Sequence, residues 1–415
     1  MHYEQLEKVP VKLKSYTVDF LKNGDYCINA MPDKESIKPA FAYTDTGYRF
    51  SDANYPVKFY CVDGKIFYRS SAGKIFKRGA DAFEQFCSVR FTTEPNIVPV
   101  IYQGRKQYLI FSSNKAVVCD LTETVVSVPY SKVYEVYNGM LFVAIDNVVR
   151  FSAPFDFTDF TMDLNLGGYM EVDGKLGNVK GLVNCEDYLL MVCEHGLAKF
   201  VCEGERVSYD YKVLTTPYLD VRDGSVKKAG DGVYFISENR LYEYKNGKLT
   251  VVDDICKNRA ITFTDRAVEC NGNYIIPVTI ADRYGVFVYV YRNKDGKSFF
   301  ADGVAALSDS GGLFLDRVTG KLSKFDSDNS SLKNAEYRSL PLDMGSDEEK
   351  RVTKIEVKTK GTCAAVLYGD FGEYACNFND GYNFIRTNLV SKNFTIKIST
   401  HLSSMLIEHM KLIYT

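Results

Sequence analysis

The chain has 415 residues, of which 46% are hydrophobic and 25% charged, a balance typical of folded proteins and unlike that of disordered or membrane-spanning chains. Its 51 Lys and Arg against 53 Asp and Glu leave a formal charge of −2, so no global basic excess indicates a protein that wraps a phosphate backbone. The 30 Tyr and 27 Phe, with no Trp, favour strands, and we expect an all-β fold.

A unit of two short strands joined by a polar turn recurs along the chain. In its first instance the turn Asp63-Gly64 joins Phe59–Val62 to Lys65–Tyr68, and Asp-Gly is a favoured hairpin turn because both positions take positive φ. The same pattern predicts later hairpins and a further unit that begins at Tyr274. The later turns are Ser113-Asn114, Asp146-Asn147, Glu194 to Gly196, Glu238-Asn239 and Asn246-Gly247.

The spacing of these units predicts the architecture of the first 330 residues. Consecutive units start about 50, 32, 48, 44 and 42 residues apart, which accommodates four short strands per unit, the size of a β-propeller blade. Since one blade cannot bury both of its faces, a closed ring of blades is the physical solution. We therefore predict a β-propeller of six or seven blades over residues 51–330, with residues 1–50 as an N-terminal segment that closes it. A β-sandwich plus a barrel would also explain the hairpins, and only Ala80–Cys87 has a short helical pattern.

The character of the chain changes near residue 330. Asp326–Ser331 is a polar, turn-rich linker, and Asp347–Arg351 is a charged loop. Short strand-like runs follow, with Gly or Asn between them, which predicts a small antiparallel β-sandwich over residues 340–415. The runs are Thr353–Thr359, Ala364–Tyr368, Glu373–Phe378, Asn383–Val390, Phe394–Ser399 and Leu406–Tyr414.

Motifs that would indicate an enzyme or a cofactor are missing from the sequence. It contains no Gly-x-x-x-x-Gly-Lys-Ser/Thr, no Gly-x-Gly-x-x-Gly and no His-Glu-x-x-His, so phosphate-cradling loops and helix-borne zinc have no sequence basis. His195 falls in a hairpin turn, and His401 and His409 fall near the C-terminus, where surface positions explain them better than general-base chemistry. We expect no catalytic residue and no cofactor.

Metal binding is not indicated either. The eleven Cys include no Cys-x-x-Cys pair, and there are four His, which is poor material for zinc. Several apolar runs end in a cysteine, which predicts reduced, buried thiols. Asp326, Asp328 and Ser330 copy the first ligand positions of a calcium loop, but Ser331 and Tyr337 replace the Gly and Glu that such a loop needs. We therefore expect no metal.

Clustered acidic residues are compatible with a second function, that of a glycan-active protein. Asp156, Asp159 and Asp163 form one cluster and Asp253-Asp254 another, and glycoside hydrolases use paired carboxylates. Both clusters fall in loops between strand-like runs, where solvated loop acids are the simpler interpretation. A carbohydrate-binding or glycan-cleaving β-propeller is therefore one alternative function, and an intracellular interaction scaffold is another.

Targeting and membrane segments are not apparent in the sequence. Met1–Glu7 lacks the basic and apolar regions of a signal peptide. The strongest apolar runs, Tyr188–Cys193 and Val286–Tyr291, are six residues long, far shorter than a spanning helix. We expect synthesis in the cytoplasm and no membrane insertion.

Two phrases of the sequence carry a resemblance to a known family. The run Arg150–Phe160 follows a hairpin, and Gly177–Leu182 leads into the next hairpin, Tyr188–Val201. This order resembles bacteriophage tail or neck structural proteins of the nozzle and stabilisation type, although Phe160 stands where that family often has Trp.

The C-terminal part carries a further resemblance to the same family. Leu340–Gly345, followed by Lys350–Val357, resembles the start of its trailing β-sandwich. The resemblance implies a structural virion component that forms a ring-like homo-oligomer and joins neighbouring parts of a tail or neck. It also implies adjacent tail or neck proteins as partners, a passive DNA channel, and a place in the virion after synthesis in the host cytoplasm.

Three phenylalanines of the run Arg150–Phe160 are the candidate interface residues. Phe155, Phe157 and Phe160 would form a hydrophobic contact with a neighbouring subunit if they were exposed, because exposed apolar patches promote association. In the alternative interpretation their rings fill the gap between two blades. The sequence alone leaves both interpretations open.

Overall fold

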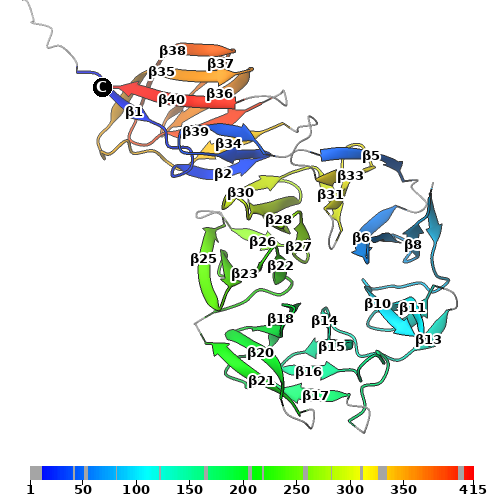
Figure 1. Cartoon of the computed structure of the whole chain (residues 1–415). Helices are drawn as coiled ribbons and strands as arrows, with labels where there is room; N and C mark the ends of the chain where they lie inside the picture. Colours follow the sequence, from blue (N-terminus) through cyan, green and yellow to red (C-terminus); the bar gives the residue numbers. More distant parts are fainter. Residues whose placement is uncertain are drawn as a thin grey trace, which may run out of the picture. The chain divides into compact units, whose positions relative to one another are not determined.

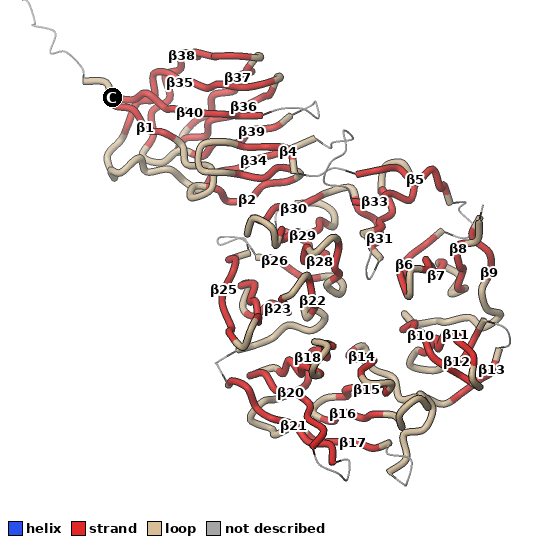
Figure 2. Tube along the Cα trace, in the orientation of Figure 1, coloured by secondary structure: helices blue, strands red, loops and turns tan. Residues whose placement is uncertain are grey.

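The fold is that of a computed structural model. The structure describes residues 12–40, 43–50, 55–80, 82–120, 123–162, 167–203, 208–216, 219–255, 260–281, 283–308, 312–325, 334–400 and 406–415. These residues form strands and contain no helix (Figure 2), so the predicted all-β fold is confirmed. The chain divides into a larger unit, Asp45–Ser298 with Gly303–Phe325, and a smaller unit, Met1–Thr44 with Phe299–Asp302 and Asp326–Thr415.

Four-stranded antiparallel meanders make up most of the larger unit, and in each of them every strand pairs with the next along the chain. The first sheet contains β6 (Pro56–Val62), β7 (Lys65–Ser70), β8 (Ile75–Arg78) and β9 (Phe83–Gln85). The second contains β10 (Asn96–Tyr102), β11 (Arg105–Phe111), β12 (Ala116–Cys119) and β13 (Thr124–Val126). The third contains β14 (Val133–Tyr137), β15 (Met140–Ile145), β16 (Val148–Phe151) and β17 (Gly168–Glu171).

The later sheets of the larger unit follow the same plan. The fourth contains β18 (Val179–Asn184), β19 (Leu189–Cys193), β20 (Gly196–Glu203) and β21 (Ser208–Thr215), and the fifth β22 (Lys227–Ala229), β23 (Gly232–Ser237), β24 (Arg240–Lys245) and β25 (Lys248–Asp254). Next, β26 (Ile261–Phe263) and β27 (Val268–Cys270) both pair with β28 (Asn273–Ile280), and β29 (Phe287–Arg292) and β30 (Lys297–Ala301) follow. The last sheet contains β31 (Val304–Leu307), β32 (Leu313–Asp316), β33 (Lys321–Phe325) and β5 (Tyr43–Arg49).

The hairpins predicted at Asp63-Gly64 and Asn246-Gly247 are present with positive φ at both turn positions. Asp63 and Gly64 have φ values of 52° and 71°, and Val62 pairs with Lys65 across the turn. Asn246 and Gly247 repeat the geometry between β24 and β25, with φ values of 51° and 75°. The turn residues therefore set the register of these strands from local sequence.

The sheets of the larger unit follow one another around a ring, with the first strand of each near the middle (Figure 1). Tyr and Phe side chains pack the gaps between neighbouring sheets, which explains the aromatic composition of the chain. The ring pairs across these gaps include Phe67–Tyr108 at 5.1 Å, Phe111–Tyr134 at 5.5 Å, Phe142–Phe200 at 4.9 Å and Tyr234–Tyr274 at 5.9 Å. The arrangement is propeller-like.

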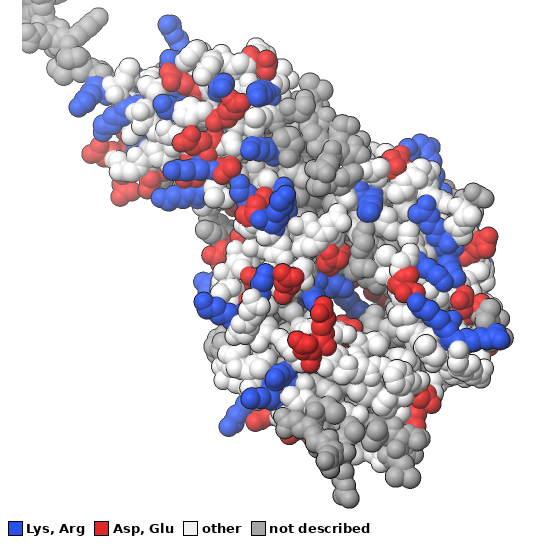
Figure 3. Space-filling model, in the orientation of Figure 1, with Lys and Arg blue, Asp and Glu red and all other residues white. Residues whose placement is uncertain are grey.

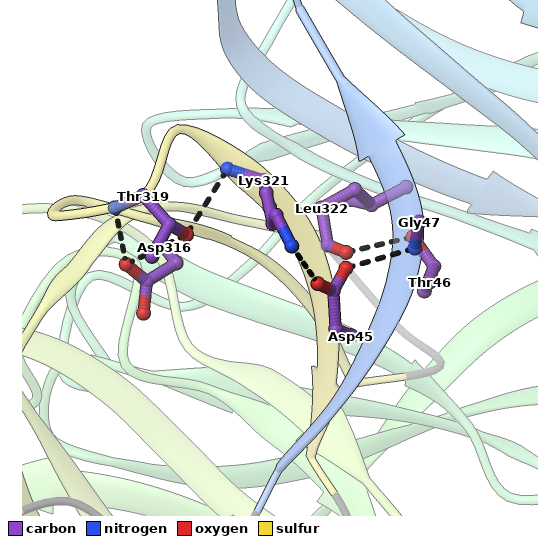
Figure 4. A network of polar contacts seen from close by, with 7 residues as sticks. All are labelled: Asp45, Thr46, Gly47, Asp316, Thr319, Lys321 and Leu322. Carbon is purple, nitrogen blue, oxygen red and sulfur yellow. Dashed lines mark hydrogen bonds and ion pairs between the residues drawn. The ribbon is translucent and has the colours of Figure 1, made fainter.

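The ring is closed between its first and last sheets. Phe59 of β6 forms a parallel bridge with Ser308, and both residues are buried. The last sheet is itself completed by β5, which precedes all the others in the chain. Thr46 donates a hydrogen bond to the Leu322 carbonyl at 2.7 Å, and Asp45 forms an ion pair with Lys321 (Figure 4).

The smaller unit joins strands from both ends of the chain. One sheet has the order β3 (Ala30–Pro32), β4 (Ile37–Pro39), β40 (Leu406–Tyr414), β35 (Lys350–Lys360) and β38 (Gly381–Ser391), and β1 (Lys14–Thr17) also pairs with β40. In the other group, β2 (Gly24–Ile28), β34 (Glu336–Ser339), β39 (Thr395–Ser399), β36 (Cys363–Gly369) and β37 (Gly372–Phe378) are successive neighbours.

The N-terminal segment differs from the prediction for residues 1–50. Only β5 enters the ring, whereas β1 to β4 belong to the smaller unit, where Lys14 lies opposite Tyr414. The chain re-enters the smaller unit at Asp326, close to the predicted boundary. The sequence does not reveal the destination of β1 to β4, because an apolar alternation shows that a strand exists and not which distant strand it joins.

The helical pattern of Ala80–Cys87 is a wrong prediction, since Phe83–Gln85 forms β9. The ring of Phe83 lies 5.0 Å from that of Tyr68 and 5.4 Å from that of Tyr48. This aromatic packing between β9 and its neighbours overrides a weak local preference for helix. The predicted linker Asp326–Ser331, with its calcium-like pattern, lies outside the described residues.

Candidate interaction site

A loop that follows β16, Ser152–Thr161, is held in place by its own hydrogen bonds. The buried Ser152 hydroxyl accepts a hydrogen bond from the Leu141 amide at 2.9 Å. Oδ1 of Asp156 accepts hydrogen bonds from the amide and hydroxyl of Thr158, at 3.0 and 2.7 Å. Asp and Thr side chains commonly fix turns in this way, and the loop presents its side chains from a defined backbone.

The three predicted interface phenylalanines have different environments in this loop. Phe157 is buried, 8% exposed, within an apolar cluster that joins the second and third sheets, and the half-buried Phe160 packs against the same cluster. Phe155 is 71% exposed. The rings of Phe157 and Phe160 therefore fill the gap between two sheets, as in the second interpretation of the sequence, and the candidate interface reduces to Phe155.

The backbone of Phe155 has an unusual conformation for a bulky residue. Its φ is 61°, in the left-handed region that side chains other than Gly, Asn and Asp rarely adopt. The Phe155 amide donates a hydrogen bond to the Gly139 carbonyl at 2.6 Å, which stabilises this conformation. Gly139 has a φ of 71°, which strains any residue with a side chain, and a Cβ there would lie 2.7 Å from Cε1 of Phe155.

A cavity of about 210 Å³ lies beside Phe155. Its floor is apolar and consists of Val100, Leu109, Val118 and Phe157, all buried. The exposed side chain of Ile101, which is 55% exposed, also lines it. We call this cavity, with Phe155 and Ile101 at its opening, the Phe155 pocket.

Asp156 gives the Phe155 pocket its electrostatic character, since it is the one charged residue among the residues that line the cavity. The Asp156 side chain is exposed, so its charge is available to a ligand. The other polar lining residues are Tyr102, Gln103 and Thr158. An apolar group with a neighbouring cation is therefore the complementary ligand.

The described acidic residues of the two clusters are engaged in local contacts. Asp156 and Asp159 each accept hydrogen bonds from the threonine two residues later, Thr158 and Thr161. Asp253 and Asp254 lie in β25 and not in a loop as expected: Asp253 accepts a hydrogen bond from Tyr289 at 2.5 Å, and Asp254 pairs with Arg240 at 3.1 Å. Asp163 lies outside the described residues.

His195 lies at the surface in a hairpin turn, as the sequence predicts. His195 is exposed in the turn between β19 and β20, with Nδ1 2.8 Å from the Leu219 carbonyl. His409 lies in β40, and His401 is not among the described residues. In the part of the chain that the structure describes, no three His, Cys, Asp or Glu side chains are grouped as metal ligands would be. No helix long and apolar enough to cross a membrane occurs among the same residues.

A half-buried ion pair links β6 to the segment between β26 and β27 and to the segment before β10. Nζ of Lys58, whose side chain is 8% exposed, lies 2.8 Å from Oδ2 of Asp265 and 3.8 Å from Oε1 of Glu94. Burial alone would raise the pKa of Asp265, but the Lys58 ammonium, together with the amide and guanidinium of Arg266, holds the pKa below its ordinary value. Basic side chains are visible at the hollow in the middle of this unit, close to acidic ones (Figure 3).

Sequence reasoning missed both Ile101 and this ion pair. Ile101 lies two positions before the hairpin turn Gln103-Gly104, and an isoleucine near that exposed end was an available signal of an apolar surface. Lys58 and Asp265 are 207 positions apart. No local pattern links them.

Comparisons with known proteins give structural likeness only. No protein-family model and no curated protein matches the sequence. Among solved structures, the chain is similar to Raptor of Chaetomium thermophilum, with 10% identity over 70% of this chain and 30% of that one and a TM-score of 0.45. It is also similar to BamB from Moraxella catarrhalis, with 9% identity over 77% of this chain and 100% of that one and a TM-score of 0.40.

A third likeness is to the WD40 domain of Pan2 from Neurospora crassa, with 9% identity over 73% of this chain, 98% of that one and a TM-score of 0.37. This chain spans 30% of the Raptor chain. The resemblance to phage tail or neck proteins has no matching family model and stays a prediction. The strand pairing places the chain in the class of all-β proteins, with a propeller-like larger unit.

Proposed function

We propose that the protein is a non-enzymatic β-propeller scaffold that binds another protein at the Phe155 pocket. The larger unit is then a propeller of seven blades completed by β5, and the smaller unit is a β-sandwich. One observation carries the functional proposal: an exposed phenylalanine is held in a left-handed backbone conformation beside an apolar cavity. The left-handed backbone of Phe155 and its exposed apolar ring are both unfavourable in an isolated chain. Unfavourable features of this kind are concentrated at functional positions.

The size of the Phe155 pocket favours a protein side chain over a small-molecule ligand. Its volume of about 210 Å³ is below the range of roughly 300 to 1,000 Å³ that is usual for small-molecule sites. An apolar side chain inserted into a small desolvated pocket is the usual centre of a protein interface. We therefore propose as occupant an extended segment with one bulky apolar side chain next to a Lys or Arg, whose charge lies near Asp156.

The tail or neck role implied by the sequence resemblance is a more specific form of this proposal. In that form the occupant belongs to a neighbouring virion protein, and copies of the chain assemble into a ring in the virion. Native mass spectrometry of the purified protein at high concentration tests it, with a closed ring as the expected result. A monomer that binds no protein of the same particle would contradict the virion role and leave the scaffold role untouched.

Selection from a random peptide library tests the Phe155 pocket directly. We expect wild-type protein to enrich peptides with a bulky apolar residue next to Lys or Arg. Phe155→Gly removes the ring, and we expect it to weaken binding of those peptides about 30-fold, the effect of an interface residue worth about 2 kcal/mol. Gly adopts positive φ without strain, so we expect the free energy of unfolding not to fall.

Val125→Ala is the matched control for the peptide experiment. Val125 is 78% exposed on β13, in the same sheet as Ile101, and does not line the pocket. We expect this variant to bind the selected peptides as wild type does. Equal binding of those peptides by wild type and Phe155→Gly would show that the pocket is not the docking site.

A further inference from the structure

A second, polar cavity lies between the fifth sheet and the sheet of β27 to β29. Its volume is about 520 Å³. The turn between β22 and β23 and the turn between β27 and β28 both contribute to it. The polar side chains that line it include Glu243, Lys245, Asn271, Asn273, Asn293 and Lys294. We call this cavity the asparagine pocket.

A buried tyrosine fixes two of the lining side chains. The Tyr234 hydroxyl donates a hydrogen bond to Oε1 of Glu243 at 2.6 Å and also contacts Oδ1 of Asn293. Burial, followed by the hydrogen bond to Glu243, raises the pKa of Tyr234, so this hydroxyl keeps its proton. Nδ2 of Asn293 donates to the Ala229 carbonyl at 3.0 Å. The Glu243 and Asn293 groups are therefore held in place before any ligand arrives.

Other lining groups are free or loosely held among the described residues. The side chains of Asn271, Asn273 and Lys294 form no hydrogen bond or ion pair with the described residues. Lys245 is only loosely engaged, 3.6 Å from the largely exposed Asp231. Tyr291 also lines the pocket, and burial raises its pKa to about 12, so it remains an uncharged hydroxyl at neutral pH.

The balance of these groups defines the chemistry of a ligand. Asp231 and Glu243 oppose Lys245 and Lys294, so the site has no formal net charge and does not favour a phosphate or a metal ion. Each asparagine amide offers a donor and an acceptor, which match the donor and acceptor of a hydroxyl group. The volume lies within the range for small-molecule sites.

We propose that the asparagine pocket binds a neutral polyhydroxylated ligand, a saccharide of one or two units. This site is distinct from the Phe155 pocket and shares no residue with it. It is also distinct from the acidic clusters that the sequence suggested for a glycan-active protein. Binding is proposed and not cleavage, because Glu243 is engaged by Tyr234 in a fixed structural contact.

Titration of the whole protein with defined sugars tests this site. Glucose, galactose, mannose, N-acetylglucosamine and their β-linked disaccharides are added up to about 10 mM and followed by saturation-transfer NMR and calorimetry. We expect at least one to bind with a Kd of about 1 mM or lower. Asn273→Ala should weaken binding of that sugar at least about tenfold, since it removes a donor and an acceptor that no other described residue uses.

Three further variants make the outcome decisive. Glu243→Gln should also weaken binding of the sugar. The urea concentration at its unfolding midpoint shows whether the contact with Tyr234 is kept. Lys248→Ala, in the same hairpin as Lys245 but outside the pocket, and Phe155→Gly should both bind as wild type does. The proposal is overturned if no sugar binds at about 10 mM, or if the sugar that binds is held equally well by Asn273→Ala; neither result bears on peptide binding.

Discussion

Replacing Phe157 by alanine is expected to lower the free energy of unfolding by about 3 to 5 kcal/mol. The Phe157 ring is buried between the second and third sheets, among Leu109, Val118, Leu141 and Val143. Truncation removes the transfer free energy of the ring and leaves a cavity that two rigid sheets cannot collapse to fill. Urea denaturation followed by circular dichroism measures the change, since the chain has no Trp.

Two variants control this measurement. Phe157→Leu keeps most of the apolar volume and should cost less than about 1.5 kcal/mol. Phe155→Gly alters the same loop at an exposed side chain and should not lower stability. If Phe157→Ala unfolded at the same urea concentration as wild type, the loop would not be packed between the sheets as described.

The variant Asp265→Asn should be less stable than wild type by about 1 to 2 kcal/mol, less than for a fully buried ion pair because the Asp265 side chain is 34% exposed. The change keeps the shape of the side chain and removes its charge. The buried ammonium of Lys58 is then left with Glu94 alone, 3.8 Å away. Adding Lys58→Met should recover part of the loss, because no unpaired charge remains buried; an Asp265→Asn protein as stable as wild type contradicts the role of the pair.

The same ion pair gives a defined dependence on pH. Because the pKa of Asp265 is lowered in the folded protein, its contribution is fully present above the ordinary aspartate pKa of about 3.9 and is lost as the pH falls through the lower folded value. The stability difference between wild type and Asp265→Asn should therefore be constant near neutral pH and shrink below about pH 4. A difference that grew on acidification would have the wrong sign.

Local sequence was sufficient for most of the ring. Turn pairs such as Asp63-Gly64 and Asn246-Gly247 impose positive φ at both positions, and the apolar runs beside them can only be strands of a hairpin. Repetition of that unit then requires neighbouring sheets to cover each other. These are short-range constraints, which a single sequence contains in full.

The pairing of distant strands and the composition of the two pockets could not be predicted from the sequence, because neither depends on local residues alone. The strand β1 pairs with β40, and nothing in Lys14–Thr17 selects that partner over another strand. Phe155 and Phe157 are two positions apart in one aromatic phrase, yet one is exposed and the other buried, because the turn at Asp156 points them in different directions. The asparagine pocket depends on four separate segments, and its asparagines look like ordinary turn and strand-end residues in the sequence.

The position of β5 in the chain affects the order in which the larger unit folds. Asp45 and its partner Lys321 are 276 positions apart, so during synthesis β5 leaves the ribosome long before β33 exists. The intervening sheets must form while the backbone hydrogen-bonding groups of β5 have no partner strand. Closure of such a long loop is slow. We expect ring closure to be the last event of folding and the nascent chain to be most vulnerable to aggregation just before it.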